Sequence, residues 1–315
     1  MKWKILISAP YAMPVIDSYR KRLEAENCEL VVVSVNERLE ENELLPIVTD
    51  IDGIICGDDR ITARVIQAAP RLKVISKWGT GIDSIDVEAA ARRNIKVCNT
   101  PNAFSEPVAD TVLAYILLFA RQVARMNTDI RANRWQKPQL VSLREKTVGV
   151  VGVGNCGKAV VRRAVAFGMR VLGNDIVEIS PEFLSSTGIE SVSLPALLKQ
   201  ADFVTLHTNL NPKSFHLFND AAFQQMKPGA YLINTARGPV VEEAALVQAL
   251  ESGKIAGAAL DVFEIEPLPS DSRLRQFDNC WLSPHNANSS PLYANRVHER
   301  TIRNLLNELK PHANA

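Results

Sequence analysis

Residues 146–157 read Lys-Thr-Val-Gly-Val-Val-Gly-Val-Gly-Asn-Cys-Gly, an apolar strand that runs directly into a Gly-x-Gly-x-x-Gly turn. In such a turn Gly152 lets the chain leave the strand tightly, Gly154 lets the backbone approach a pyrophosphate, and Gly157 lets the next helix pack closely. A glycine pattern alone is weak evidence, but here the preceding strand supports it. The stretch therefore predicts a dinucleotide-binding loop.

The residues after the loop complete the expected nucleotide-binding unit. The segment 159–167 (AVVRRAVAF) is helical in pattern, and the N–H groups near the start of this helix, those of Asn155 and Cys156, are expected to face a phosphate. A second strand at 170–174 ends at Asp175. An acid at this position accepts hydrogen bonds from the ribose hydroxyls of NAD and repels the 2′-phosphate of NADP. We therefore predict NAD as the cofactor.

Composition limits the other classes of function. The 315 residues are 46% hydrophobic and 23% charged with a net charge of +1, a balance that gives no attraction toward nucleic acid or an anionic membrane surface. The five cysteines are odd in number and form no C-x-x-C pair. We therefore expect neither a metal site nor disulfides, and a cytoplasmic location. The N-terminus shows no signal-peptide pattern, and the apolar segment 108–120 is too short to span a bilayer.

Strand-like runs alternate with helical runs along most of the chain, which is typical of an α/β fold with parallel sheets. Five candidate strands precede the glycine turn, and six begin with it. The first series is 4–8, 30–33, 53–56, 73–76 and 95–97; the second is 147–151, 170–173, 203–206, 230–233, 256–260 and 280–282. A dinucleotide domain that opened the chain would carry its glycine turn much earlier. An independent doubly wound domain therefore precedes a Rossmann domain.

One long helical pattern, 291–309, remains after the six Rossmann strands are placed. We infer that this helix returns to the N-terminal unit, and that a helix from about Ser105 to about Ala124 is the outward crossover. The expected domains are a discontinuous substrate-binding (catalytic) domain, 1–103 plus 286–315, and an NAD-binding domain, 104–285. The cleft between them is the expected site.

Three polar residues follow predicted Rossmann strands, at the edge where open α/β sheets bind ligands: Arg237, Glu266 and His285. A guanidinium can hold a carboxylate by two parallel hydrogen bonds. An imidazole titrates near neutrality and can protonate a carbonyl oxygen. A carboxylate beside it fixes the tautomer and favours the charged form. Together these side chains suit hydride transfer to a 2-oxo acid.

In nearly its whole length the chain resembles the D-isomer-specific 2-hydroxyacid dehydrogenase family, which includes phosphoglycerate dehydrogenases, glyoxylate and hydroxypyruvate reductases and D-lactate dehydrogenases. The matching stretches, besides the glycine turn with Asp175, are GTGIDSID (79–86), NTP (99–101), VAD (108–110), NTARG (234–238), LDVFEIEP (260–267) and SPH (283–285). The resemblance implies a flavodoxin-like substrate domain with an inserted NAD-binding Rossmann domain. It also implies a homodimer, with the neighbourhood of segment 108–120 at the interface.

The resemblance assigns roles to particular residues. It implies that Arg237 binds the substrate carboxylate, that Glu266 pairs with His285, and that His285 is the acid/base. Asp261 would contact the nicotinamide carboxamide. Further expected contacts are, for the substrate carboxylate, the backbone of Gly79, Thr80 and Gly81 and, for the cofactor, His207, Thr208, Thr235 and Ala236. Glu264 competes with Glu266 for the acid's role, and we favour Glu266 because it directly precedes Pro267 as in the family pattern.

The leading hypothesis is an NAD-dependent dehydrogenase that interconverts a 2-oxo acid and a D-2-hydroxy acid, similar to phosphoglycerate dehydrogenase without its regulatory domain. Glyoxylate or hydroxypyruvate reductase is an alternative, because Asp58 and Asp59 would repel a substrate phosphate, although Arg60 and Lys77 could offset them. An NAD-sensing, non-catalytic corepressor is an alternative of another class. After His285 the chain reads NANSS (286–290), where the family usually has small apolar residues and glycine.

Overall fold

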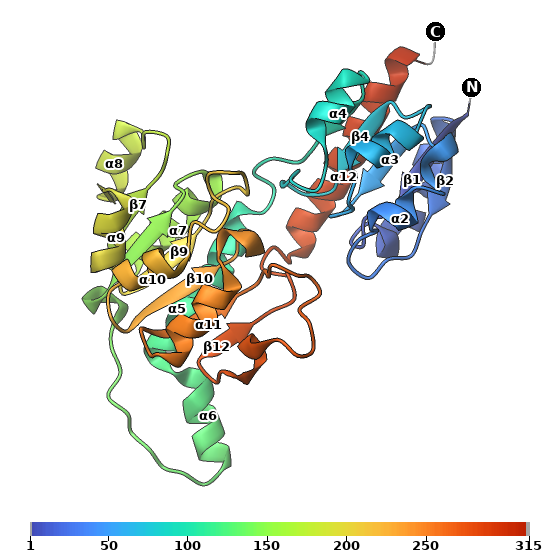
Figure 1. Ribbon diagram of the computed structural model, residues 1–315. Coiled ribbons are helices and arrows are strands. Elements are labelled where there is room, and N and C mark those ends of the chain that lie inside the picture. Colours follow the sequence, from blue (N-terminus) through green and yellow to red (C-terminus); the bar gives the residue numbers. More distant parts are fainter. Residues whose placement is uncertain (1, 313–315) are drawn as a thin grey trace. The chain divides into compact units, whose positions relative to one another are not determined.

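The computed structural model describes residues 2–312 and divides into two compact units (Figure 1), which are described separately below. The first comprises Met1–Ala103 with Ser290–Ala315, and the second comprises Phe104–Ser289. The second unit ends four residues later than the sequence suggested, because the Asp261 carboxylate binds the N–H groups of Asn286 and Ala287. Met1 and residues 313–315, which the domain prediction included, lie outside the described residues.

The first unit is built on a five-stranded parallel sheet in the order β2-β1-β3-β4-β5. This 2-1-3-4-5 order is that of flavodoxin-like folds. The strands are β1 (Trp3–Ile7), β2 (Cys28–Val32), β3 (Gly53–Cys56), β4 (Val74–Lys77) and β5 (Lys96–Cys98); the helices between them are α1 (Ile16–Ala25), α2 (Glu41–Leu44), α3 (Ala63–Ala68) and α4 (Val87–Arg92). Residues of β3 and β4 are buried throughout, as expected of parallel strands covered on both faces.

The last helix, α12 (Pro291–Leu309), packs on this first sheet although it follows the second unit in the chain. The Ser76 hydroxyl on β4 donates to the carbonyl oxygen of Thr301 at 2.9 Å. A Cβ at Gly53 on β3 would lie 2.9 Å from a methyl of Leu305, so glycine makes room for the helix. Leu292, which falls in the helical apolar pattern, is instead 57% exposed.

The second unit carries a seven-stranded parallel sheet in the order β12-β11-β10-β9-β6-β7-β8. Counted from β6, the order is 3-2-1-4-5-6 with β12 added at the edge, which is a Rossmann sheet. The strands are β6 (Thr147–Val151), β7 (Arg170–Asn174), β8 (Glu190–Ser191), β9 (Phe203–Leu206), β10 (Ala230–Asn234), β11 (Ile255–Leu260) and β12 (Cys280–Leu282). The prediction of six strands was wrong by one, since β8 has two exposed residues and no apolar pattern.

The helices of the second unit are α5 (Ser105–Arg121), α6 (Val123–Arg131), α7 (Asn155–Ala166), α8 (Pro181–Thr187), α9 (Leu194–Gln200), α10 (Asp220–Gln225) and α11 (Glu243–Glu251). A single helix to about Ala124 was expected, but Gln122 adopts a left-handed conformation (φ +47°) and separates α5 from α6. The two helices meet at a bend of 55°, and among the described residues no single helix has the length and apolar character needed to cross a membrane; only this bent pair has them jointly.

Candidate active site

The glycine turn joins β6 to α7 with Gly154 as the N-cap of the helix. Gly152 has a φ of +91°, which other residues rarely adopt. A Cβ at Gly157 would lie 2.0 Å from the carbonyl oxygen of Gly152, so helix and turn touch backbone to backbone. A Cβ at Gly154, in contrast, would meet no heavy atom within 4 Å. The turn is therefore tight beneath Gly157 and open at Gly154, where a phosphate would approach.

Asp175 follows β7 and lies against this turn. Its carboxylate accepts the N–H of Val153 at 2.6 Å and the N–H of Val177 at 3.0 Å. A carboxylate has about four acceptor sites, so sites remain for ribose hydroxyls. In Cys156, in the first turn of α7, burial raises the pKa of the thiol to about 12. The thiol thus stays protonated at neutral pH, and the backbone N–H is the group that Cys156 offers to a phosphate.

Two further predicted cofactor residues carry buried hydroxyls with unused hydrogen-bonding capacity. Within the part of the chain that the structure describes, the hydroxyls of Thr208 and Thr235 are buried and have no protein partner. The ring of His207 lies beside Thr205, with Nε2 2.9 Å from the hydroxyl, and burial lowers the pKa of this imidazole to about 4. Buried hydroxyls without a partner on the loops that follow β9 and β10 fit a bound dinucleotide.

Arg237 follows β10 in a turn that Asn234 shapes. The Asn234 side chain accepts the N–H of Ala236 at 3.0 Å and donates to the carbonyl oxygen of Arg237 at 2.9 Å. A Cβ at Gly238 would lie 1.8 Å from the carbonyl oxygen of Phe263, so the loops after β10 and β11 approach closely. The motif NTARG (234–238) contains Asn234, but the sequence alone indicated no role for it; the signal that could have found it is an amide at the end of a buried strand.

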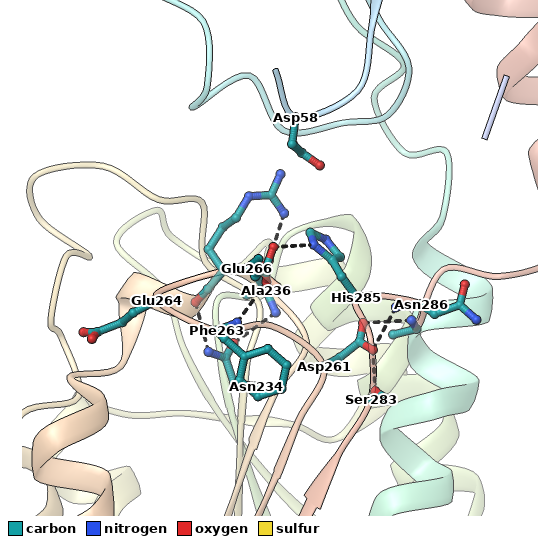
Figure 2. A network of polar contacts seen from close by, with 12 residues as sticks. Asp58, Asn234, Ala236, Asp261, Phe263, Glu264, Glu266, Ser283, His285 and Asn286 are labelled. Carbon is teal, nitrogen blue, oxygen red and sulfur yellow. Dashed lines mark hydrogen bonds and ion pairs between the residues drawn. The ribbon is translucent and has the colours of Figure 1, made fainter. Parts of the chain in front are cut away.

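His285 and Glu266 follow β12 and β11, and their side chains meet (Figure 2). Nδ1 of His285 lies 3.0 Å from Oε2 of Glu266, whose other oxygen accepts the N–H of Phe263 at 2.9 Å. Because an ionised carboxylate only accepts, Nδ1 carries the proton in the neutral imidazole. Nε2 is then the nitrogen that can exchange a proton with a substrate oxygen.

Glu264 points away from this pair in Figure 2. Its carboxylate lies 2.7 Å from Nε2 of His216 and accepts the N–H of Glu243 at 3.4 Å. The backbone N–H of Glu264 in turn donates to the Glu243 carboxylate at 2.7 Å. Burial, followed by the charge of Glu264, raises the pKa of Glu243. The two acids that the sequence left in competition therefore contact different histidines.

The predicted substrate-binding turn of the first unit follows β4. Gly79 has a φ of +120°, its carbonyl oxygen accepts the N–H of Thr100 at 2.9 Å, and the Thr80 hydroxyl donates to the carbonyl oxygen of Thr100 at 3.0 Å. Gly81 completes the turn. The turn is therefore anchored to the segment that follows β5.

The charges near this turn differ from the expected arrangement. Lys77 is buried, and its ammonium pairs with the Asp58 carboxylate at 3.0 Å. Asp59 was expected to repel a substrate phosphate, but it is fully buried and accepts the Ser8 hydroxyl and the Leu39 N–H, each at 2.6 Å. That expectation was wrong, because these hydrogen bonds hold the Asp59 carboxylate in the interior of the first unit. Of the two aspartates, only Asp58 remains at the carboxyl edge of the sheet.

The doubly wound sheet, the glycine turn with Asp175 and the His285–Glu266 pair together define an NAD-dependent dehydrogenase. The family model described as D-isomer specific 2-hydroxyacid dehydrogenase, NAD binding domain, matches residues 113–287. The chain belongs to this family.

Relatives of this chain include enzymes with different substrates. A glyoxylate reductase of Thermofilum pendens is 40% identical over 293 residues, covering 90% of this chain and 86% of that protein. A D-3-phosphoglycerate dehydrogenase of Methanocaldococcus jannaschii is 39% identical over 291 residues, covering 91% of this chain and 54% of that protein. The crystal structure of D-lactate dehydrogenase from Aquifex aeolicus, complexed with NAD and lactic acid, has a TM-score of 0.86 at 27% identity and covers 98% of both chains.

Proposed function

We propose that this enzyme reduces a small, unphosphorylated 2-oxo acid of the glyoxylate or hydroxypyruvate type to the corresponding 2-hydroxy acid, the D isomer where the product is chiral, with NADH as the reductant. The pairing of Lys77 with Asp58 supports this choice. The ammonium of Lys77 already has a carboxylate partner, so it offers little free positive charge to a phosphate dianion. The similarity to a glyoxylate reductase along most of both chains supports the same choice.

The catalytic roles follow from the groups after β10, β11 and β12. Bound NADH would supply the hydride for the carbonyl carbon. Arg237 carries a permanent charge and a planar set of donors, so we assign it to the substrate carboxylate. His285 gives the carbonyl oxygen a proton from Nε2, and the Glu266 carboxylate on Nδ1 stabilises the imidazolium that provides it. In the reverse direction Nε2 accepts the proton of the hydroxyl group.

The residues that would hold the cofactor occupy the adjoining strand ends. We assign the pyrophosphate to Gly154 and the N–H groups of Asn155 and Cys156, and the ribose to Asp175. The unpartnered hydroxyls of Thr208 and Thr235 support contacts from these loops. Ala236 and His207 are assigned as neighbours of the cofactor. The family resemblance implies that Asp261 contacts the nicotinamide carboxamide. Three protein donors already bind its carboxylate, which leaves about one acceptor site for the amide.

The decisive experiment compares substrates in parallel. NADH oxidation is measured with glyoxylate, hydroxypyruvate, 3-phosphohydroxypyruvate and pyruvate. We expect glyoxylate and hydroxypyruvate to have higher kcat/KM values than 3-phosphohydroxypyruvate. A kcat/KM for 3-phosphohydroxypyruvate above that of hydroxypyruvate would reject the substrate proposal. If that occurs, Asp58→Asn shows whether the Asp58–Lys77 pair opposes or permits phosphate binding.

A second experiment tests the reaction itself. We expect His285→Ala to lower kcat by about 10²- to 10⁴-fold, the usual contribution of general acid catalysis. Binding of NADH, followed by its fluorescence, should persist because His285 is assigned to the substrate oxygen rather than to the dinucleotide. An unchanged kcat would remove His285 from the mechanism.

We also propose a homodimer that works in the reducing cytoplasm, with neither nucleic acid nor a membrane as partner. All five cysteines are free, which fits a compartment where thiols stay reduced. Helix α6 has no buried residue, and its Val123 and Ile130 are 60% and 51% exposed. Val123 and Ile130 are seven positions apart and therefore share one face of the helix. Exposed apolar side chains on one face can mark an interface, and a second copy of the chain is the occupant we propose.

A further inference from the structure

The turn that carries His285 (residues 283–287, the His285 turn) has an unusual backbone conformation. His285 is not glycine, yet its φ is +49°, in the left-handed region. Such a conformation is unfavourable for a residue with a side chain and persists when the surroundings hold it in place. The neighbours of the turn therefore decide where the imidazole lies.

Asp261, which follows β11, forms hydrogen bonds to the His285 turn on both sides of His285 (Figure 2). Its carboxylate accepts the Ser283 hydroxyl, the N–H of Asn286 at 2.9 Å and the N–H of Ala287 at 2.8 Å. Its backbone oxygen also accepts the N–H of His285 at 2.8 Å. Asp261 is only 2% exposed, so water competes little for these hydrogen bonds.

Helix α5 holds the same turn from another side. The Tyr115 phenol lies 2.6 Å from the Ser283 hydroxyl, and the Thr111 hydroxyl donates to the carbonyl oxygen of Ala287 at 3.1 Å. Residues 111 and 115 are four apart and therefore share one face of the helix. This face of α5 contacts the turn both before and after His285.

The direction of these hydrogen bonds follows from counting protons. A carboxylate only accepts, so the single proton of the Ser283 hydroxyl goes to Asp261. The Tyr115 phenol must then be the donor to Ser283. Burial raises the pKa of Tyr115, and the phenol therefore keeps its proton at neutral pH. The two hydrogen bonds therefore have one direction: Tyr115 donates to Ser283, and Ser283 donates to Asp261.

We propose that Tyr115 and Ser283 are positioning residues for His285, acting through Asp261. They hold the His285 turn so that Nδ1 stays on Glu266 and Nε2 stays available to the substrate. This inference rests on the role proposed above for His285. It adds a residue of α5, Tyr115, to those that position the imidazole. Removing either hydroxyl should loosen the imidazole while leaving the dinucleotide loop intact.

The kinetic test uses single-atom and matched variants. We expect Tyr115→Phe and Ser283→Ala each to lower kcat/KM for the 2-oxo acid about tenfold, because small misplacements of a catalytic group have effects of this size or larger. The double variant should lose little more than either single one, since both break the same chain. Ser283→Thr, which keeps a hydroxyl, should recover most of the activity. Tyr231→Phe removes the hydroxyl of a β10 tyrosine whose ring stacks on Phe119 of α5. The ring stays in place, so kcat/KM should remain within about twofold of the parent value.

A second readout needs no cofactor. In protein labelled with ¹⁵N-histidine, the neutral His285 ring, assigned by comparison with His285→Asn, should show the Nδ1–H tautomer. Tyr115→Phe and Ser283→Ala should convert it to a mixture of tautomers, whereas Tyr231→Phe should not. Unchanged tautomer and kcat/KM in both variants would overturn the proposal, as would a loss confined to NADH affinity. If His285→Ala were itself fully active, the proposed function would fail instead.

Discussion

Glu264 and Glu266 show how two acids two positions apart acquire different partners. Glu266 binds the imidazole of His285, and Glu264 binds that of His216. A strand-end pattern can nominate both acids but cannot separate them, because the loop geometry after β11 decides which one faces His285. The family pattern ending in Pro267 favoured Glu266, and the structure places Glu266 against His285.

This difference leads to a paired prediction. Glu266→Gln replaces a carboxylate that stabilises the imidazolium with a neutral amide, so kcat should fall about tenfold to hundredfold, corresponding to the ~1.5–3 kcal/mol of a hydrogen bond to a charged group. Glu264→Gln makes the same chemical change on the neighbouring acid and should alter kcat less than about threefold. Steady-state kinetics at saturating NADH compares the two. Equal losses in both variants would contradict the separation of roles.

Asp59 shows what the sequence could not predict at this scale. Its charge suggested a surface group in a substrate loop, yet its partners Ser8 and Leu39 lie far away in the chain. Burial raises the pKa of this carboxyl group, with the hydrogen bonds from Ser8 and Leu39 acting in the opposite direction. A side chain's direction depends on such distant partners, and local sequence carries no signal for it.

Among the elements, the turn between β6 and α7 assigns different tasks to its glycines. Gly157→Ala should lower Tm by about 5–10 °C, because its Cβ would meet the Gly152 carbonyl at 2.0 Å and overpacking of this kind costs about 1–3 kcal/mol or more. Gly154→Ala meets no protein atom, so Tm should change by less than about 2 °C. It should nevertheless weaken NADH binding at least about tenfold, since the added methyl occupies the space for the pyrophosphate.

Thermal unfolding and NADH fluorescence titration measure these two effects separately. Unaltered NADH affinity in a folded Gly154→Ala protein would show that the dinucleotide does not approach the backbone there. A fully stable Gly157→Ala protein would show that the turn can open without loss of packing.

Elements with a strong apolar pattern were predictable, and those without one were not. The strand at 53–56 and the helix at 291–309 were predicted with the bounds that β3 and α12 have. The two exposed residues of β8 left no signal. The break at Gln122 left none either, because neither glycine nor proline marks it. Hydrophobic periodicity reports burial, so it is silent where an element ends or pairs without burying a side chain.

For the whole molecule, the order of its parts along the chain was readable from the late glycine turn and the surplus C-terminal helix. The end of the second unit was harder to predict from the sequence, because the hydrogen bonds of Asp261 to Asn286 and Ala287 extend that unit to Ser289. These contacts join residues 25 and 26 positions apart. Hydrogen bonds between residues so far apart in the chain cannot be detected from hydrophobic periodicity.

The assembly of the whole molecule gives the last prediction. The segment after α6 exposes Trp135 to 79%, and α6 itself exposes Val123 and Ile130. A large aromatic side chain buried by a partner is a frequent hot spot, worth about 2 kcal/mol or more. In analytical ultracentrifugation we expect the parent protein to have twice the chain mass of 34.8 kDa. The Trp135→Ser protein should be a monomer at micromolar concentration. Phe167→Ser, which removes another exposed aromatic (48%) at the end of α7, should leave the dimer intact. A parent protein that sediments as a monomer at all concentrations would refute the dimer, and a dimeric Trp135→Ser protein would move its interface away from α6.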